Sequence, residues 1–218
     1  IILSSKTTTG LSILRLLPVA LRITSGKILF HGEDLFALPG HRMRQIRGKD
    51  ISMIFQEPLN ALNPLLTIGQ QINEVLICHM PLTAKQRRER VLELLNIVGM
   101  AEPQRVAQNY PHQLSGGMRQ RAMIAQAIAA NPQLMIADEP TSSLDVTLQA
   151  KIMDLFRELR RSLNLSILLI THDLGMVRHL ADEVVVLQAG KIVEQGPVAH
   201  VLESPRHQYT QQLISSVF

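Results

Sequence analysis

The chain has 218 residues, of which 46% are hydrophobic, and a formal net charge of +4. This length and composition fit one domain with a sizeable core. The basic residues are scattered along the chain, tryptophan is absent, and aromatic residues make up only 3%. A base-stacking surface is therefore disfavoured, and we expect no nucleic-acid partner.

Two further features of the composition narrow the class of protein. Cys78 is the only cysteine, so no disulfide can form within the chain, and we expect Cys78 to be a small core residue in a reducing compartment. No apolar run approaches the roughly 18 residues of a membrane-spanning helix. Residues Ile1–Leu3 are too short for the apolar part of a signal peptide. Any membrane role is therefore expected to be peripheral.

The first residues predict a strand, a polar loop and a helix. Ile1–Leu3 is typical of the end of a buried strand, and Ser4–Thr9 is typical of a polar turn. Gly10–Leu17 is predicted to be helical until Pro18 stops it. A strand, a short loop ending in Lys-Thr and a helix form the context of a phosphate-binding loop. A chance Lys-Thr pair at a helix start is the alternative.

In a phosphate-binding loop, Lys6 would reach the β- and γ-phosphates and the Thr7 hydroxyl would bind Mg²⁺. Ser5 and Thr8 flank this pair and are further candidates for phosphate contact. The full pattern requires a glycine where Ser5 stands, and its first glycine would fall before Ile1. The match to the phosphate-loop pattern is therefore incomplete.

The next segment predicts alternating short elements. Ile23–Phe30 is expected to be a strand with a turn at Ser25-Gly26, His31–Asp34 a turn and Pro39–Ile46 a short helix. Ile51–Phe55 is expected to be a buried strand that ends at Gln56. A glutamine at a strand end, before a proline-rich loop, could act as a mobile ligand sensor. The alternative is an ordinary turn.

From Thr67 to Ala130 the pattern is helical. Thr83 opens a capping box, and the apolar residues that follow it repeat at helical spacing. Leu114–Arg121 is polar and glycine-rich, and it runs directly into a helix predicted over Gly117–Ala130. A phosphate could lie against the backbone of this stretch.

A pair of carboxylates follows a short apolar run. Leu134–Ala137 predicts a buried strand that delivers Asp138 and Glu139 at its carboxyl end, where α/β folds place ligand sites. Asp138 suits Mg²⁺ binding, and Glu139 suits polarising a water for attack on phosphorus. A solvated loop is the alternative. Asp145 is expected to cap a helix that runs to about Leu163.

The last apolar run is expected to be a fully buried parallel strand. Ser166–Thr171 forms this run and ends at His172, at the same end of the predicted sheet as Asp138 and Glu139. His172 is therefore a candidate phosphate contact, with a purely structural histidine as the alternative. The remaining elements are expected to be a helix over Leu174–Leu180, strands over Glu183–Gln188 and Lys191–Glu194, a short helix over Pro197–Glu203 and an amphipathic segment over His207–Phe218.

Taken in order, these motifs resemble the ATP-binding subunit of an ABC transporter. The stretches that carry the resemblance match the family's Q-loop, signature motif, Walker B strand with its glutamate, D-loop and switch histidine; they are Gln56, Leu114–Met118, Leu134–Glu139, Ser143–Asp145 and His172. Lys6-Thr7 matches the end of the family's Walker A motif. The resemblance implies an α/β fold, with a P-loop NTPase (RecA-like) core, an inserted α-helical subdomain and the N-terminal strands missing.

Four shorter stretches look like one subfamily. Ile54–Pro58, Asn60–Pro64, Tyr110–Leu114 and Pro205–Thr210 are similar to importers of oligopeptides, dipeptides, glutathione or nickel, although Gln208 replaces the usual proline. The resemblance implies a single nucleotide-binding domain over 1–218 that lacks its N-terminal part. Its expected parts are a core lobe over about 1–60 and 132–200, a helical subdomain over about 61–131 and a family tail over about 201–218.

The resemblance implies two ATP-binding subunits, as a homodimer or a heterodimer, that meet head to tail around two ATP molecules with Mg²⁺. In one chain the phosphates would be held by Ser5, Lys6, Thr7 and Thr8, and Mg²⁺ by Thr7, Gln56 and Asp138. The opposite chain would cap the γ-phosphate with Ser115, Gly116 and Gly117. Asp145, in the D-loop, is a further candidate for nucleotide binding. Glu139 would orient the attacking water, His172 would contact the γ-phosphate, and Gln56 would transmit closure to a membrane permease.

The other implied partners are integral permease subunits and, indirectly, a solute-binding protein, with the chain on the cytoplasmic face of the bacterial inner membrane. The chain departs from the family in lacking the Walker A glycines, the upstream strand and the aromatic residue that stacks on adenine. A truncated active subunit or a degenerate, non-hydrolysing partner subunit would each explain these departures. A soluble ABC ATPase that acts on nucleic acid or ribosomes is a further alternative.

Overall fold

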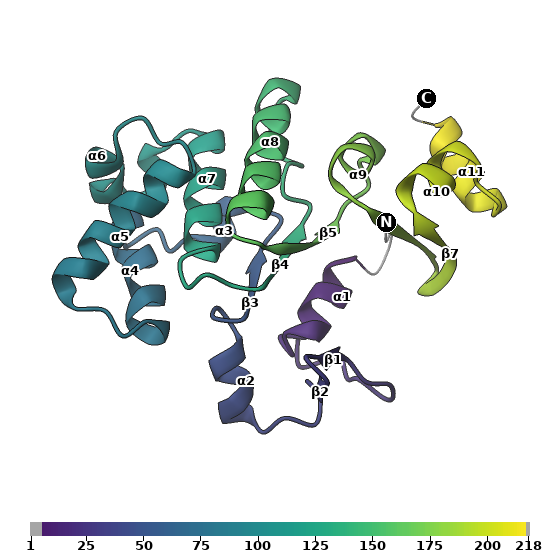
Figure 1. The fold of residues 1–218 in the computed structure, drawn as a ribbon, viewed down its shortest axis with the longest axis horizontal. Helices are drawn as coiled ribbons and strands as arrows, with labels where there is room; N and C mark the ends of the chain where they lie inside the picture. Colours follow the sequence, from purple (N-terminus) through teal and green to yellow (C-terminus); the bar gives the residue numbers. More distant parts are fainter. Residues whose placement is uncertain (1–5, 217–218) are drawn as a thin grey trace. The chain divides into compact units, whose positions relative to one another are not determined.

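The computed structural model describes residues 6–216 (Figure 1). The predicted strand end at Ile1–Leu3, together with Ser5, lies outside the described residues. The chain divides into two compact units, one over Leu38–Leu168 and one made of Ile1–Ala37 with Leu169–Phe218. Among the described residues, no helix is long and apolar enough to cross a membrane.

The first unit is built on a parallel sheet. Strand β3 (Ile51–Ile54) pairs in parallel with β4 (Leu134–Asp138), with Ile51 opposite Leu134 and Ile54 opposite Ala137. Strand β5 (Ser166–Ile170) follows in the order β3-β4-β5. The predicted buried strands are confirmed for β3 and β4, because most of their side chains are buried on both faces, as parallel strands require.

Strand β5 is less buried than the sequence predicts. Its side chains alternate between exposed and half-buried along Ser166–Leu169, and Leu168 is 36% exposed. The physical reason is its place in the sheet, since β5 is the last strand in the three-stranded order. A continuous apolar run shows that a segment is strongly hydrophobic, but it does not show that both faces of the strand will be covered.

The helices of this unit are α2 (Gly40–Ile46), α3 (Pro58–Ala61), α4 (Ile68–His79), α5 (Ala84–Ile97), α6 (Pro103–Gln108), α7 (Gly116–Ala127) and α8 (Val146–Ser162), with a 3₁₀ turn over Pro111–Gln113. Helices α4, α5 and α6 pack on one another, and α7 packs against α4 and α5 and also against β3 (Figure 1). The helical pattern expected from Thr67 to Ala130 is confirmed, and Thr83 closes the predicted capping box with Gln86. Helix α7 therefore connects the outer helices to the sheet.

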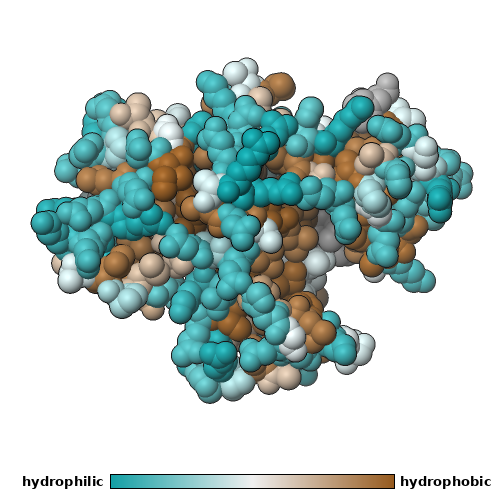
Figure 2. Space-filling view, in the orientation of Figure 1, coloured by the Kyte–Doolittle hydropathy of each residue, from teal (hydrophilic) through white to brown (hydrophobic). Residues whose placement is uncertain are grey.

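The surface of this unit corrects one expectation. Hydrophilic residues cover much of the face drawn in Figure 2, but large apolar side chains remain exposed, including Leu65 at 82% and Ile77 at 56%. Cys78 is also exposed and is not the core residue that the sequence predicts. The buried face of α4 follows Ile68, Ile72 and Leu76, so Cys78 lies about 200° around the helix from Leu76.

The N-terminal part of the second unit differs from the sequence predictions. Helix α1 covers Lys6–Ile13, so residues 6–9 of the predicted polar turn are helical, and Arg15 in the left-handed region (φ 52°) ends the helix before Pro18. The strand predicted over Ile23–Phe30 is wrong, because only β1 (Leu29–Phe30) forms, paired with β2 (Glu33–Asp34). A strand requires a partner strand for its backbone groups, and the ladder of β1 with β2 covers only two residue pairs. Ile28, just before β1, bonds the Asp34 carboxylate and the Leu35 N–H.

The rest of the second unit packs around an antiparallel hairpin. Strands β6 (Glu183–Gln188) and β7 (Lys191–Pro197) are joined at Ala189 and Gly190, both in the left-handed region, as a tight hairpin turn requires. Helices α9 (Leu174–Leu180), α10 (Val198–Glu203) and α11 (Gln208–Ser215) complete the unit. One buried cluster around this hairpin consists of valines: Val177, Val184, Val186, Val198 and Val201.

Candidate functional site

The glycine-rich stretch forms the start of α7. Ser115 is the N-cap residue, and its Oγ accepts a hydrogen bond from the Met118 N–H at 3.3 Å. Ser115 and Gly116 are exposed, whereas Gly117 is buried. The first N–H groups of a helix have no acceptor within the helix, so they can donate to an anion. We call Ser115, Gly116 and Gly117 the Ser115 turn.

The Ser115 turn packs against the loop that holds Asp145. A Cβ atom placed on Gly117 would lie 3.2 Å from Leu148 Cδ1, and one on Gly116 would lie 3.8 Å from Leu144 Cδ2. Gly117 is therefore required for close packing on the start of α8. Sequence reasoning assigned this glycine to phosphate contact alone, because no local signal connects it to Leu148.

Asp145 caps α8, as predicted. Its Oδ1 accepts a hydrogen bond from the Leu148 N–H at 2.9 Å. The amide of Gln149 secures the same loop by donating to the carbonyls of Thr141 and Leu144, both at 3.2 Å. Gln149 was missed in the sequence, where nothing distinguishes it from the other polar residues of an amphipathic helix.

The two carboxylates lie at the carboxyl end of β4. Asp138 is 1% exposed and Glu139 is 7% exposed, so the alternative of a solvated loop is wrong. Glu139 has φ 47°, in the left-handed region that residues other than glycine rarely adopt. Its carbonyl accepts hydrogen bonds from the N–H and the hydroxyl of Ser142, at 3.3 and 3.2 Å. Such conformations cluster at functional sites, where the surrounding structure holds them in place.

Gln56 lies at the same edge of the sheet. It lies two residues beyond Ile54, which stands opposite Ala137 in the parallel register, so Gln56 and Asp138 both follow the carboxyl ends of adjacent strands. Gln56 is exposed. The buried Gln71 holds the loop after it, since its amide bonds the N–H and the carbonyl of Asn63 and the carbonyl of Leu66. A glutamine on the apolar face of α4 was the signal that could have revealed this anchor.

The other candidates belong to the second unit. Lys6 opens α1, and Thr7 and Thr8 are exposed in its first turn. His172 is exposed and follows the buried Thr171, whose hydroxyl accepts the N–H of Asp173 at 3.1 Å. Polar side chains therefore lie at the start of α1 and just before α9.

The donor set suits a magnesium ion that is carried by a nucleotide. Among the described residues, no group of three or more His, Cys, Asp or Glu side chains could hold a metal. Mg²⁺ usually keeps several waters and binds one or two protein oxygens together with substrate phosphates. The amide of Gln56 and the buried carboxylate of Asp138, at the same edge of the sheet, supply oxygens of this kind. The residues thus fit a phosphate-bound ion better than a dedicated protein cage.

Comparison with known proteins identifies the family of the chain. Residues 6–142 match the family model described as ABC transporter. The chain belongs to the ABC transporter family. The resemblance stated from the motifs is confirmed.

Curated members of the family are similar over nearly the whole chain. The peptidoglycan transport ATP-binding protein YejF of Agrobacterium fabrum is 52% identical over 98% of this chain and 39% of its own length. The dipeptide transport ATP-binding protein DppD of Bacillus subtilis is 49% identical over 97% of this chain and 64% of its own length. The chain therefore spans less than two thirds of the length of these relatives.

Solved structures show the same fold. The ATP-binding cassette MJ0796, in a dimeric post-hydrolysis state bound to ADP and Pi, has a TM-score of 0.76 and 29% identity over 90% of this chain and 83% of that chain. The cbiO1 protein of Clostridium perfringens, part of an ABC transporter complex, has a TM-score of 0.78 and 27% identity over 93% of this chain and 78% of that chain. The chain has the α/β ABC ATPase fold, and the expected fold class is confirmed.

Proposed function

We propose that this chain is the nucleotide-binding module of an ATP-driven membrane importer for peptides or a similar small solute. The observation that carries the proposal is the buried pair Asp138 and Glu139 at the carboxyl end of β4, with Glu139 in a left-handed conformation. Solvation of the protein surface does not explain a carboxylate that is buried at this place. It suits the chemistry of phosphate hydrolysis, because it can orient a water in a site that excludes bulk solvent.

Each residue at the sheet edge has a separate task in this proposal. Glu139 accepts a proton from the attacking water and orients it toward the γ-phosphate. Asp138 and Gln56 lie where they can hold Mg²⁺, directly or through its waters. When bound, Mg²⁺ neutralises charge that develops on the phosphates. The hydrogen bonds of Ser142 to the Glu139 carbonyl keep the turn in place.

The start of α1 supplies the remaining contacts with the bound nucleotide. Lys6, Thr7 and Thr8, together with Ser5, would hold the phosphates through side chains and helix N–H groups. Thr7 would add its hydroxyl to the Mg²⁺ ligands. His172 would donate a hydrogen bond to the γ-phosphate.

The Ser115 turn would act on the nucleotide of a second ATP-binding subunit. Ser115 and Gly116 are exposed at the positive end of a 12-residue helix, so the hydroxyl and the N–H groups of these two residues can reach a partner. Asp145 belongs to the same surface, because Leu144 and Leu148 pack on the turn. A head-to-tail dimer fits these exposed groups, and the dimeric MJ0796 cassette supports this interpretation.

The proposed membrane partner is a permease that docks on the helical subdomain over about 61–131. Exposed Leu65 and Ile77 offer apolar contact area there. For the core lobe, the helical subdomain and the C-terminal tail, the bounds that we propose are those expected from the sequence. The chain would lie peripherally on the cytoplasmic face of the bacterial inner membrane, and a solute-binding protein would select the solute. The names of the relatives favour peptides as that solute.

The experiment is Glu139→Gln in the full-length subunit assembled with its permease. We expect ATP turnover to fall by about 10²–10⁴-fold, because the base is lost, while ATP binding and ATP-dependent dimerisation persist. Glu158→Gln changes an exposed glutamate of α8 and should leave turnover within about twofold. Unchanged turnover in Glu139→Gln would refute the role of Glu139. A wild-type subunit that binds ATP but does not hydrolyse it would instead favour the non-hydrolysing partner.

A further inference from the structure

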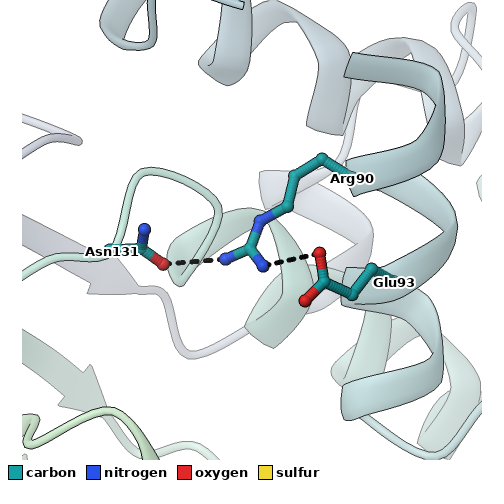
Figure 3. Close-up of polar contacts among 3 residues, drawn as sticks. All are labelled: Arg90, Glu93 and Asn131. Atoms are coloured by element: carbon teal, nitrogen blue, oxygen red, sulfur yellow. Dashed lines mark hydrogen bonds and ion pairs between the residues drawn. The ribbon is translucent and has the colours of Figure 1, made fainter. Parts of the chain in front are cut away.

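Arg90 joins an outer helix to the start of β4. Its Nη2 donates to Asn131 Oδ1 at 2.7 Å, and its Nη1 pairs with Glu93 Oε2 at 2.8 Å (Figure 3). The Arg90 side chain is only 18% exposed, whereas that of Glu93 is 58% exposed. Because 41 residues separate Arg90 from Asn131, this contact is tertiary, and it ties α5 to the turn between α7 and β4.

Asn131 is a rigid anchor for this contact. Its φ is 55°, a conformation in which asparagine and aspartate are enriched, and its N–H donates to the Ile128 carbonyl at 3.0 Å. The next residues are fixed to the sheet, since the N–H groups of Gln133 and Leu134 donate to the Asp50 carbonyl at 3.0 and 3.1 Å. Asn131 therefore stands on a turn that is bound to the start of both β3 and β4.

A second arginine links the same two helices further along. Arg121, in α7, donates to the carbonyl of Val98 at the end of α5. A Cβ atom on Gly99 would lie 2.6 Å from Arg121 Nη1, so this glycine leaves the space that the guanidinium occupies. Helices α5 and α7 thus run antiparallel, and each of them sends one arginine toward the other helix's C-terminal end.

We propose that Arg90 is a positioning residue for the Ser115 turn, which rests on the role proposed for that turn above. Helix α7 has 12 residues and a length of about 18 Å. If its C-terminal end were released, a tilt of about 10° would move the Ser115 turn by about 3 Å over that length. Misplacement of about 1 Å can cost a large factor in rate. The contact of Arg90 with Asn131 adds to the Asp50 bonds in holding the end of α7 that lies opposite the reacting groups.

The test is hydrogen–deuterium exchange in the full-length subunit without nucleotide. We expect Arg90→Ala and Asn131→Gly to raise exchange about tenfold over residues 128–134 and at Met118, while β3 is unchanged. Asn131→Asp keeps both the acceptor and the left-handed turn, and it should retain wild-type protection. Glycine also tolerates the turn, so this pair of variants differs only in the side chain that Arg90 contacts.

Two control variants separate the contact from loss of charge. Glu93→Gln removes the charge of the exposed partner of Arg90, and Arg105→Ala removes an arginine whose pair with Glu102 is 65% and 57% exposed. Both should leave exchange within about twofold, because exposed ion pairs contribute little. Equal exchange in Arg90→Ala and Arg105→Ala, or in Asn131→Asp and Asn131→Gly, would overturn the proposal.

A positioning role is distinguished from a merely structural one by measuring kcat and KM for ATP separately in the assembled transporter. Arg90→Ala should lower kcat by about 3–10-fold and leave KM for ATP within about twofold, because the chain's own phosphate contacts are intact. An unchanged kcat, or equal loss in kcat and in affinity, would overturn the positioning role. If the wild-type subunit proved to lack ATPase activity, the proposed function would fail, but the exchange at Met118 would still decide whether Arg90 fixes the turn.

Discussion

The carboxyl end of β4 and the start of α7 are built in opposite ways. Asp138 and Glu139 are buried and Glu139 is held in a left-handed conformation, whereas Ser115 and Gly116 are exposed and in a regular helix cap. Groups that act on the chain's own ligand can be enclosed by the chain's own fold. Groups that act on a neighbour's ligand must stay at the surface and rely on packing from behind. The difference in burial therefore supports a site shared between two subunits.

The largest expected effect concerns Glu139 at the carboxyl end of β4. Glu139→Gly should lower ATP turnover by about 10²–10⁴-fold, as expected for loss of a general base. Its free energy of unfolding should nevertheless exceed that of Glu139→Ala by about 1 kcal/mol, because only glycine adopts φ 47° without a steric penalty. Urea denaturation of both variants, with parallel ATPase assays, measures the two effects. Equal stability of the two variants would show that the Glu139 conformation is not strained.

The sequence predicted those parts of the site that depend on local signals. Strands β3 and β4 follow from short apolar runs, and the caps at Ser115 and Asp145 agree with the residue preferences of helix N-termini. The predicted strand at Ile23–Phe30 failed because apolar content does not ensure a pairing partner. Cys78 was misplaced because its helix buries only one face.

The contacts that support the site could not be predicted in this way. The packing of Gly117 on Leu148 joins residues from different helices, and the bonds of Gln71 to the loop after Gln56 cross from α4 to that loop. The backbone conformation of Glu139 also depends on the turn that Ser142 closes. Each of these features is tertiary, so a single sequence carries no periodic or capping signal for it.

An intermediate effect concerns the packing of the Ser115 turn on the start of α8. Gly117→Ala should destabilise the chain by about 1–2 kcal/mol relative to Gly116→Ala, because its Cβ would approach Leu148 to 3.2 Å, whereas the Gly116 position has 3.8 Å to the nearest atom. Both variants gain the same kind of helix propensity, so the difference isolates the contact. Thermal unfolding measures it. Adding Leu148→Ala should remove most of the difference, and no such rescue would mean that Leu148 does not limit the position.

The smallest expected effect concerns a third carboxylate that we assign to structure and not to chemistry. Burial alone would raise the pKa of Glu194, but the Arg206 N–H at 2.8 Å, the nearby Thr210 hydroxyl, the His207 N–H at 3.1 Å and the charge of His207 together lower it. A lowered pKa in the folded state stabilises the chain above the ordinary pKa of 4.5, and this contribution is lost as the pH falls through the folded value.

Glu194→Gln should therefore cost about 1 kcal/mol or less at pH 7, since the group is partly exposed, and the difference from wild type should shrink as the pH falls below 4.5 and through the lowered pKa of Glu194. Denaturant unfolding at several pH values measures this change. Glu203→Gln alters an exposed glutamate of α10 and should stay within about 0.5 kcal/mol at every pH. ATP turnover at pH 7 should stay within about twofold in Glu194→Gln. A loss of turnover as large as that of Glu139→Gly would contradict the assignment of Glu194 to structure. Glu194, which is hydrogen-bonded and far from the sheet edge in sequence, would then share the catalytic role of Glu139.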